Sequence, residues 1–198
     1  MDLNEARALA CRSMGDKRFQ HTLNVEALAV ELARQYGADP QKAALAALLH
    51  DCAKELPKEE LLRIMRENVI IAENGERRPA PVWHGICAAI LARTQWGVAD
   101  EEILNAVACH TTGRPGMTQL DKILFLADMT CAERDFPGVE HLRALTRQNL
   151  DLAMVEALQH TVRFVQQSGK PVDPMGLAAC EDLQQRLARQ SQAETVSK

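Results

Sequence analysis

The stretch AALAALLHD, residues 43–51, places a histidine and an aspartate directly behind a run of small apolar side chains. Alanine and leucine are among the strongest helix formers. Asp39 followed by Pro40 is the pair of residues typical of an N-cap and a first helical position. The stretch therefore predicts a helix of small apolar side chains that ends in His50 and Asp51.

Helix-length segments with start and stop signals continue on both sides of this stretch. We expect helices over residues 17–36, 82–96, 100–110, 139–147 and 150–168, others opening at Asp2, Asp39, Pro57, Thr118 and Asp173, and loops over 69–81 and 111–117. No segment shows the sustained two-residue alternation of a half-buried strand. The sequence therefore predicts an all-α helical bundle, with one domain over residues 1–190 and a disordered polar tail over 191–198.

The composition is that of an ordinary soluble globular protein, with 46% hydrophobic and 25% charged residues among 198. The net charge of −4 argues against a nucleic-acid polymer or a membrane as partner, because both need clustered cations. The six cysteines form no C-x-x-C pair, which indicates free thiols in a reducing compartment. Since the N-terminus does not resemble a signal peptide and the apolar runs are too short to span a bilayer, we expect a cytoplasmic protein.

Four polar side chains lie on apolar helix faces and are candidates for a metal site: His21, His50, Asp51 and Asp128. A buried carboxylate without a partner is costly, so the two aspartates require a nearby cation. One metal ion bound by all four side chains would satisfy them together. A mixed set of imidazole nitrogens and carboxylate oxygens suits iron, manganese, zinc or cobalt better than calcium or magnesium.

The ordinary interpretation of such residues is structural. A lone histidine on an apolar face is usually a hydrogen-bonded core residue, and we assign His141 and His160 that role or simple exposure. Cys52 and Cys109 are expected to be small core side chains. The metal hypothesis is favoured because the four candidates follow the order H…HD…D, on three separate predicted helices.

That order resembles the HD superfamily of metal-dependent phosphohydrolases. Further segments are similar to the YqeK-type family of symmetrical dinucleoside tetraphosphate hydrolases: KRFQHTLNV (17–25), LLHDCAKELP (48–57), WHG (83–85), CHTTGRPGM (109–117), LADMTCAERDFPGVEHLR (126–143) and SGKPVDP (168–174). The resemblance covers about residues 17–176, and HTTGRP and RDFPGV are far more specific than the HD pair. Neighbouring residues such as Cys52 and Glu133 are interpreted as variable.

The resemblance implies an iron-dependent enzyme that splits diadenosine tetraphosphate into two ADP, with manganese, cobalt or zinc as alternatives. It implies that His21, His50, Asp51 and Asp128 bind the principal metal. His84 and His110 would face a second metal ion or the phosphates and would act with Asp51 in catalysis. The implied nucleotide contacts are Arg18, Lys54, Arg134 and the turn Gly169, Lys170 and Pro171.

The same segments supply further groups suited to a polyphosphate chain. Arg114 adds a guanidinium, which is suited to bidentate phosphate contacts. Thr111, Thr112 and Gly113 offer hydroxyl and backbone N–H groups. The expected partners are a small dinucleoside polyphosphate and its ADP product.

Three alternatives remain open from the sequence. The first is another HD-domain nucleotide phosphohydrolase, such as a nucleotidase or a deoxynucleotide triphosphohydrolase. The second is a nucleotide-sensing HD module without turnover, and the third is a plain helical interaction protein. The sequence also leaves the oligomeric state open, a homodimer included.

Overall fold

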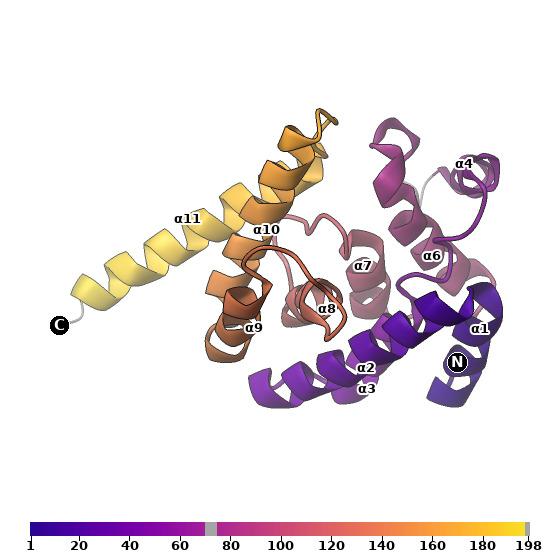
Figure 1. The fold of residues 1–198 in the computed structure, drawn as a ribbon, viewed down its shortest axis with the longest axis horizontal. Coiled ribbons are helices and arrows are strands. Elements are labelled where there is room, and N and C mark those ends of the chain that lie inside the picture. The colour runs from indigo at the N-terminus through magenta and orange to yellow at the C-terminus, as the bar shows by residue number, and fades with distance from the viewer. Residues whose placement is uncertain (70–74, 197–198) are drawn as a thin grey trace.

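The protein is a bundle of α-helices in the computed structural model, which describes residues 1–69 and 75–196 (Figure 1). The helices are α1 (Leu3–Ser13), α2 (Asp16–Tyr36), α3 (Pro40–Leu49), α4 (Lys58–Glu67), α6 (Trp83–Thr94), α7 (Glu101–Cys109), α8 (Gln119–Thr130), α9 (Val139–Gln148), α10 (Leu150–Gln167) and α11 (Pro174–Val196). Two short 3₁₀ helices, η1 (Gly75–Arg77) and η2 (Ala80–Val82), precede α6. Over the described ranges there is no β-strand, so the predicted all-α fold is confirmed.

The helix ends follow local side-chain chemistry. Asp2 forms a reciprocal capping box with Glu5 at α1, and Thr118 forms one with Asp121 at α8. The predicted loop 69–81 was only partly right, because η1 and η2 occupy its second half; residues 70–74 of that loop lie outside the described residues. The helix expected over 82–96 is shorter at both ends, since Val82 belongs to η2 and α6 ends at Thr94.

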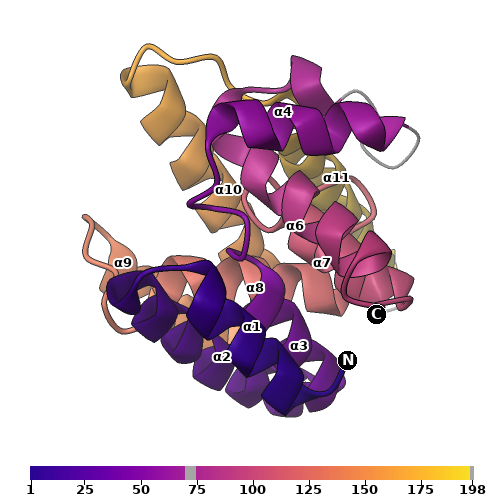
Figure 2. The same cartoon turned by 90° about the vertical axis from the view of Figure 1, so that its right-hand side faces the viewer.

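Helix α8 is the centre of the bundle and packs against α2, α3, α7, α9 and α10. Its segment ILFLA is apolar on every face, and Leu120, Ile123, Leu124 and Leu126 are almost completely buried. A helix that is apolar all round is stable only when neighbours cover it on all sides. Figure 2 shows α1, α2 and α3 gathered on one side of α8 and α4, α6 and α7 above it.

Helix α11 packs against α10 through its first turns, where Ala179 and Leu183 are buried, and then extends away from the body (Figure 1). The helix is assigned as far as Val196. Disorder of the tail over residues 191–198 stays a prediction. Among the described helices, none has the length and apolarity needed to cross a bilayer.

Candidate metal centre

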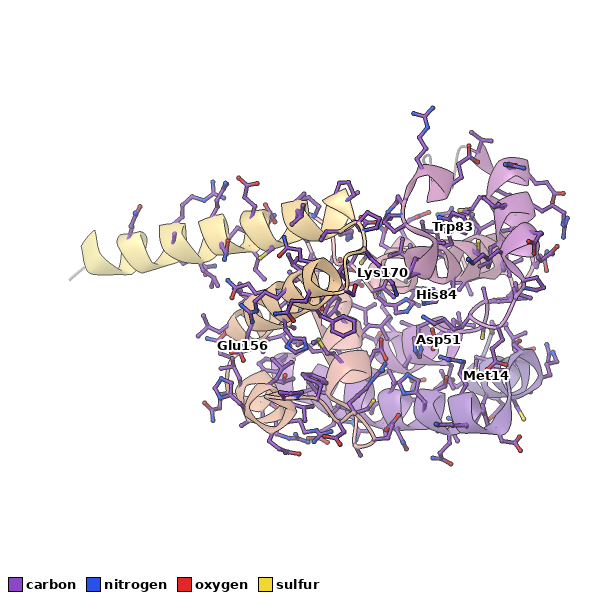
Figure 3. All side chains as sticks on the ribbon, turned by 45° about the horizontal axis from the view of Figure 1, so that its top comes forward. Met14, Asp51, Trp83, His84, Glu156 and Lys170 are labelled. Carbon is purple, nitrogen blue, oxygen red and sulfur yellow. The ribbon has the colours of Figure 1, made fainter. Side chains whose placement is uncertain are left out.

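Five helices each contribute polar side chains to one interior cluster, which we call the His/Asp cluster. Its members are His21 on α2, His50 and Asp51 at the end of α3, His84 on α6, His110 at the end of α7 and Asp128 on α8. In Figure 3, Asp51 and His84 lie next to each other in the middle of the molecule. The structure thus brings together all six residues that the sequence singled out for metal binding or catalysis.

Asp51 lies close to three histidines of the cluster. Its Oδ1 lies 3.3 Å from Nε2 of His84 and 3.7 Å from Nε2 of His110. Its Oδ2 lies 3.6 Å from Nε2 of His50 and accepts a hydrogen bond from Nη1 of Arg18 at 2.6 Å. Asp51 is only 4% exposed, so water cannot substitute for these partners. One carboxylate therefore faces three imidazoles with different oxygens, which suits a bridging ligand between two ions.

The rings of His50 and His110 are oriented by the ends of their own helices. Each occupies a C-cap, where Nδ1 donates to a free carbonyl of the preceding turn: Ala47 O at 2.6 Å and Val107 O at 2.8 Å. Donation from Nδ1 leaves Nε2 unprotonated and facing the cluster. Nε2 of His50 is fully buried, and no described residue hydrogen-bonds to it. A buried nitrogen lone pair of this kind fits a metal ligand.

His21 completes the cluster from the opposite side. Its Nε2 lies 3.0 Å from Oδ1 of Asp128 without the geometry of a hydrogen bond, and its Nδ1 lies 2.5 Å from Oε1 of Glu133. Glu133 is held in turn by Nδ2 of Asn24 at 2.8 Å. Sequence reasoning interpreted Glu133 as variable and missed this contact. Its one local signal was its place beside Arg134, because it lies in a loop without helical periodicity.

The cluster contains three overlapping groups of three residues, and within each group the ligand atoms lie within 4.8 Å of one another. The groups are His21, His50 and Asp51; His50, His110 and Asp128; and Asp51, His84 and His110. His50, Asp51 and His110 each belong to two groups. The donor set therefore fits one or two closely spaced ions. A fourth group contains His21, Cys131 and Glu133, and it lies at the Nδ1 side of the His21 ring.

Close packing of α6 on α7 brings His84 up to His110, with 3.1 Å between their Nε2 atoms. Gly85 makes this approach possible. A Cβ at that position would lie 3.0 Å from the carbonyl oxygen of Val107 and 3.1 Å from Cε1 of His110. A larger residue would push the two helices apart and separate the two imidazoles.

Burial and mutual charge set the protonation of the cluster without a metal. Burial lowers the pKa of His50, and it lowers the pKa of His84 to about 4. Burial would raise the pKa of Asp51, but the surrounding imidazoles of His50, His110 and His84 outweigh it and hold that pKa well below its usual value. Burial also lowers the pKa of His21, but the nearby Asp128 carboxylate and the Cys131 side chain raise it to about 10. The metal-free cluster therefore holds a proton on His21.

Three of the predicted substrate-binding cations lie at the cluster. Arg18 pairs with Asp51, Arg134 pairs with Asp128, and Nζ of Lys54 lies 3.2 Å from Nε2 of His84. Burial lowers the pKa of Lys54. These cations place positive charge beside Asp51, Asp128 and His84.

Arg114 stands apart from the cluster. Its Nη2 lies 2.8 Å from a carboxylate oxygen of the buried Asp121 at the start of α8, so the guanidinium is already engaged. Thr112 is also buried and accepts a hydrogen bond from Arg78, whose Nε donates to Asp173 at 2.8 Å. Sequence reasoning missed Arg78, because its partners are distant in the chain. These contacts hold the TTGRP loop to the turn before α11.

Three pockets are relevant to the site: members of the His/Asp cluster line the second and the third, and Thr111, which follows His110 in the chain, lines the first. The first, of about 460 Å³, is lined mainly by apolar side chains together with Lys58, Thr111, Thr112, Lys170, Pro171 and Asp173, and we call it the Lys170 pocket. The second, of about 340 Å³, is the aromatic pocket, lined by His110, Thr111, Phe125, Asp128, Met129, Arg134, Phe136, His160, Thr161 and Phe164. The third, of about 630 Å³, is the polar pocket, lined by Lys17, Arg18, Gln20, His21, Asn24, Glu55, Glu133 and Arg134.

The remaining predicted residues fall around these pockets. Gly169 follows α10 with a φ of 69°, the left-handed conformation that favours glycine, and leads into the wall of the Lys170 pocket. Cys52 and Cys109 are buried core side chains, as expected. His141 is exposed and pairs with Glu156, whereas His160 stacks on Phe136 in the aromatic pocket.

The family model of the HD domain matches residues 18–133, a range that contains every member of the His/Asp cluster. The chain belongs to the HD-domain family. HD domains bind divalent metals, and the orphaned nitrogen of His50 fits such a role.

Relatives of this HD-domain chain match it over most of its length. It is 39% identical to a symmetrical bis(5'-nucleosyl)-tetraphosphatase of Bacillus subtilis, over 87% of this chain and 93% of that protein. A protein of the same name from Halalkalibacterium halodurans is 38% identical over 92% of this chain and 97% of that protein. The predicted resemblance to symmetrical dinucleoside tetraphosphate hydrolases is therefore confirmed.

A solved structure shares the fold. It is a crystal structure from Clostridium acetobutylicum, described as a predicted HD superfamily hydrolase involved in NAD metabolism. It has a TM-score of 0.88 and 34% sequence identity, and the match covers 94% of this chain and 98% of that one. The agreement extends over the whole HD-domain bundle, including the helices that carry the His/Asp cluster.

Proposed function

We propose that this chain hydrolyses diadenosine tetraphosphate at its central linkage and releases two ADP. The observation that carries the proposal is the His/Asp cluster, with the orphaned Nε2 of His50 at its centre and Lys54, Arg18 and Arg134 around it. The two relatives named above are symmetrical bis(5'-nucleosyl)-tetraphosphatases, which supports the same reaction.

In this proposal His21, His50, Asp51 and Asp128 hold the principal metal ion. His84 and His110 face a second ion or the phosphates. The mixed nitrogen and oxygen donors favour iron, with manganese, cobalt or zinc as alternatives. When bound, such a cation supplies Lewis acidity and positive charge beside the reacting phosphoryl group.

The cationic side chains position the substrate. Arg18 and Arg134 now neutralise Asp51 and Asp128, and they become available to phosphate oxygens once a metal takes over those carboxylates. Lys54 lies against His84, where it can meet the phosphates at the point of cleavage. Together they offset the negative charge of the tetraphosphate and of the two ADP products.

His84 is suited to orient the attacking water. Its pKa of about 4 leaves the ring neutral at neutral pH, so one ring nitrogen can accept a hydrogen bond. Oδ1 of Asp51 lies 3.3 Å from Nε2 of His84. The leaving ADP departs as an anion and needs little proton donation.

The first nucleoside is placed in the Lys170 pocket. Its apolar wall, with Pro171 and Val162, suits the faces of a purine, and Thr111 and Thr112 can contact the adjoining phosphates. We also propose a cytoplasmic location, which the six free cysteines support. A homodimer is a further proposal that the oligomeric state in solution will test.

The decisive experiment is incubation of metal-analysed protein with diadenosine tetraphosphate, followed by chromatography of the products. We expect ADP alone, at two equivalents per substrate consumed. Early ATP and AMP in equal amounts would show asymmetric cleavage and refute the proposal. Parallel assays with AMP and dATP test the nucleotidase and triphosphohydrolase alternatives, and the Asp51→Asn variant controls for contaminating activity.

A further inference from the structure

The aromatic pocket concentrates a residue type that is scarce in this chain. Three of the four phenylalanines of the chain, Phe125, Phe136 and Phe164, line this pocket. The rings of Phe136 and His160 lie 4.6 Å apart at a tilt of 40°. Phe164 follows His160 by one turn of α10 and is 64% exposed. An exposed phenylalanine beside a stacked aromatic pair provides a surface for a further flat ring.

The aromatic pocket adjoins the reaction centre. His110 and Asp128 of the His/Asp cluster form part of its wall, and Arg134 stands at the same wall. It also shares Thr111 and Thr161 with the Lys170 pocket. The two pockets are therefore neighbours, and Thr111, which follows His110 in the chain, lies in the wall of both. Helix α10, which carries Thr161, contributes residues to the walls of both pockets.

Symmetric cleavage requires room for two nucleosides. A cut at the central linkage leaves one nucleoside diphosphate on each side of the reacting phosphorus. If the Lys170 pocket holds one nucleoside, the second must lie across the cluster from it. The polar pocket is lined by charged and amide side chains together with the His21 imidazole and contains no phenylalanine, tyrosine or tryptophan, so it is suited to phosphates rather than to a base.

We propose that the aromatic pocket binds the base of the second nucleoside, stacked against Phe136 and Phe164, while Arg134 contacts the phosphate next to it. This inference rests on the proposed function. It assigns the preference for a dinucleotide over a mononucleotide to side chains of α10 and of the loop after α8. The base is recognised by stacking, which tolerates different purines.

Kinetics of a Phe164→Ala variant test the proposal. Base stacking on an aromatic side chain is worth enough that its loss raises the KM for diadenosine tetraphosphate about ten-fold or more. The kcat should stay within about two-fold, because the contact is made equally in ground and transition states. Phe164→Tyr keeps the ring and should behave like the wild type. Leu152→Ala is the matched control, since Leu152 is 47% exposed on the same helix and lines none of the three pockets.

A probe without the second nucleoside separates this proposal from the proposed function. Adenosine 5'-tetraphosphate should inhibit the wild type and Phe164→Ala with the same Ki. If Phe164→Ala weakens binding of diadenosine tetraphosphate and of adenosine 5'-tetraphosphate equally, the first base binds in the aromatic pocket and the proposal is overturned. An unchanged KM of Phe164→Ala for diadenosine tetraphosphate would also overturn the proposal. The same holds if the only effect of Phe164→Ala is a change of oligomeric state.

The assignment of the aromatic pocket can be tested even if the proposed reaction is wrong. If the wild type does not cleave diadenosine tetraphosphate, calorimetric Kd values for the two nucleotides replace KM and Ki. Phe164→Ala should then weaken binding of the dinucleotide alone. Equal Kd values for the dinucleotide in wild type and variant would overturn the pocket assignment whatever the reaction is.

Discussion

Removal of the Glu133 carboxylate should weaken metal binding although Glu133 is itself outside the principal ligand set. Oε1 of Glu133 lies 2.5 Å from Nδ1 of His21, whose other nitrogen faces Asp128. A carboxylate that accepts from a histidine in this way fixes the orientation of the ring and raises its basicity toward a metal. We therefore expect Glu133→Ala to release the His21 ring.

The expected loss of metal affinity in Glu133→Ala depends on how exposed the Glu133 side chain is. Loss of such an outer contact costs about 10- to 100-fold in metal affinity. The Glu133 side chain is 37% exposed, so solvent screens its charge and favours the lower end, about ten-fold. Cys131 remains, with its Sγ 3.6 Å from the same Nδ1, and limits the loss further. The double variant Cys131→Ala/Glu133→Ala should lose more than either single variant.

Competition with a fluorescent chelator measures the affinity of each variant for Mn²⁺ or Zn²⁺. Glu156→Ala is the matched control, because Oε2 of Glu156 pairs with Nε2 of the exposed His141 at 3.1 Å, far from any ligand. It should bind metal as the wild type does. If Glu133→Ala also binds metal within two-fold of the wild type, the orienting role of this carboxylate is refuted.

Three further predictions follow from the same cluster. Exhaustive chelation should lower the melting temperature and abolish turnover, because the unfolded chain has no preformed site; a chelated protein of full stability and activity would contradict this. His84→Ala should keep the tightly bound metal but lose about 100-fold in kcat, whereas Asp128→Ala should lose the metal; elemental analysis beside kinetics distinguishes them, and metal loss in both would join all six residues in one coupled site. Since the pKa of His21 is about 10 and its ring must be neutral to bind metal, affinity should rise about ten-fold per pH unit between pH 6.5 and 8.5. Calorimetry in buffers of different ionisation enthalpy should detect one proton released, and none released at pH 7 would sink this prediction.

The sequence alone determined the fold class and the identity of the polar cluster. Alanine- and leucine-rich segments between clear caps, as at Asp39 and Thr118, can form helices by local interactions, so their positions are readable from short stretches of chain. His50 and Asp51 were conspicuous because they end such a segment. The motif segments around His84 and His110 identified the family before any contact was known.

Only the tertiary structure decided how these side chains are used. The contact between His21 and Glu133 joins residues 112 positions apart, and no local pattern encodes it. The pairing of Arg114 with Asp121 is likewise a contact that no motif in the sequence indicated. Which nitrogen of His50 faces the cluster depends on the Ala47 carbonyl and on the helices packed around it. Helix formation is local, whereas ligand geometry depends on packing between helices that are distant in the chain.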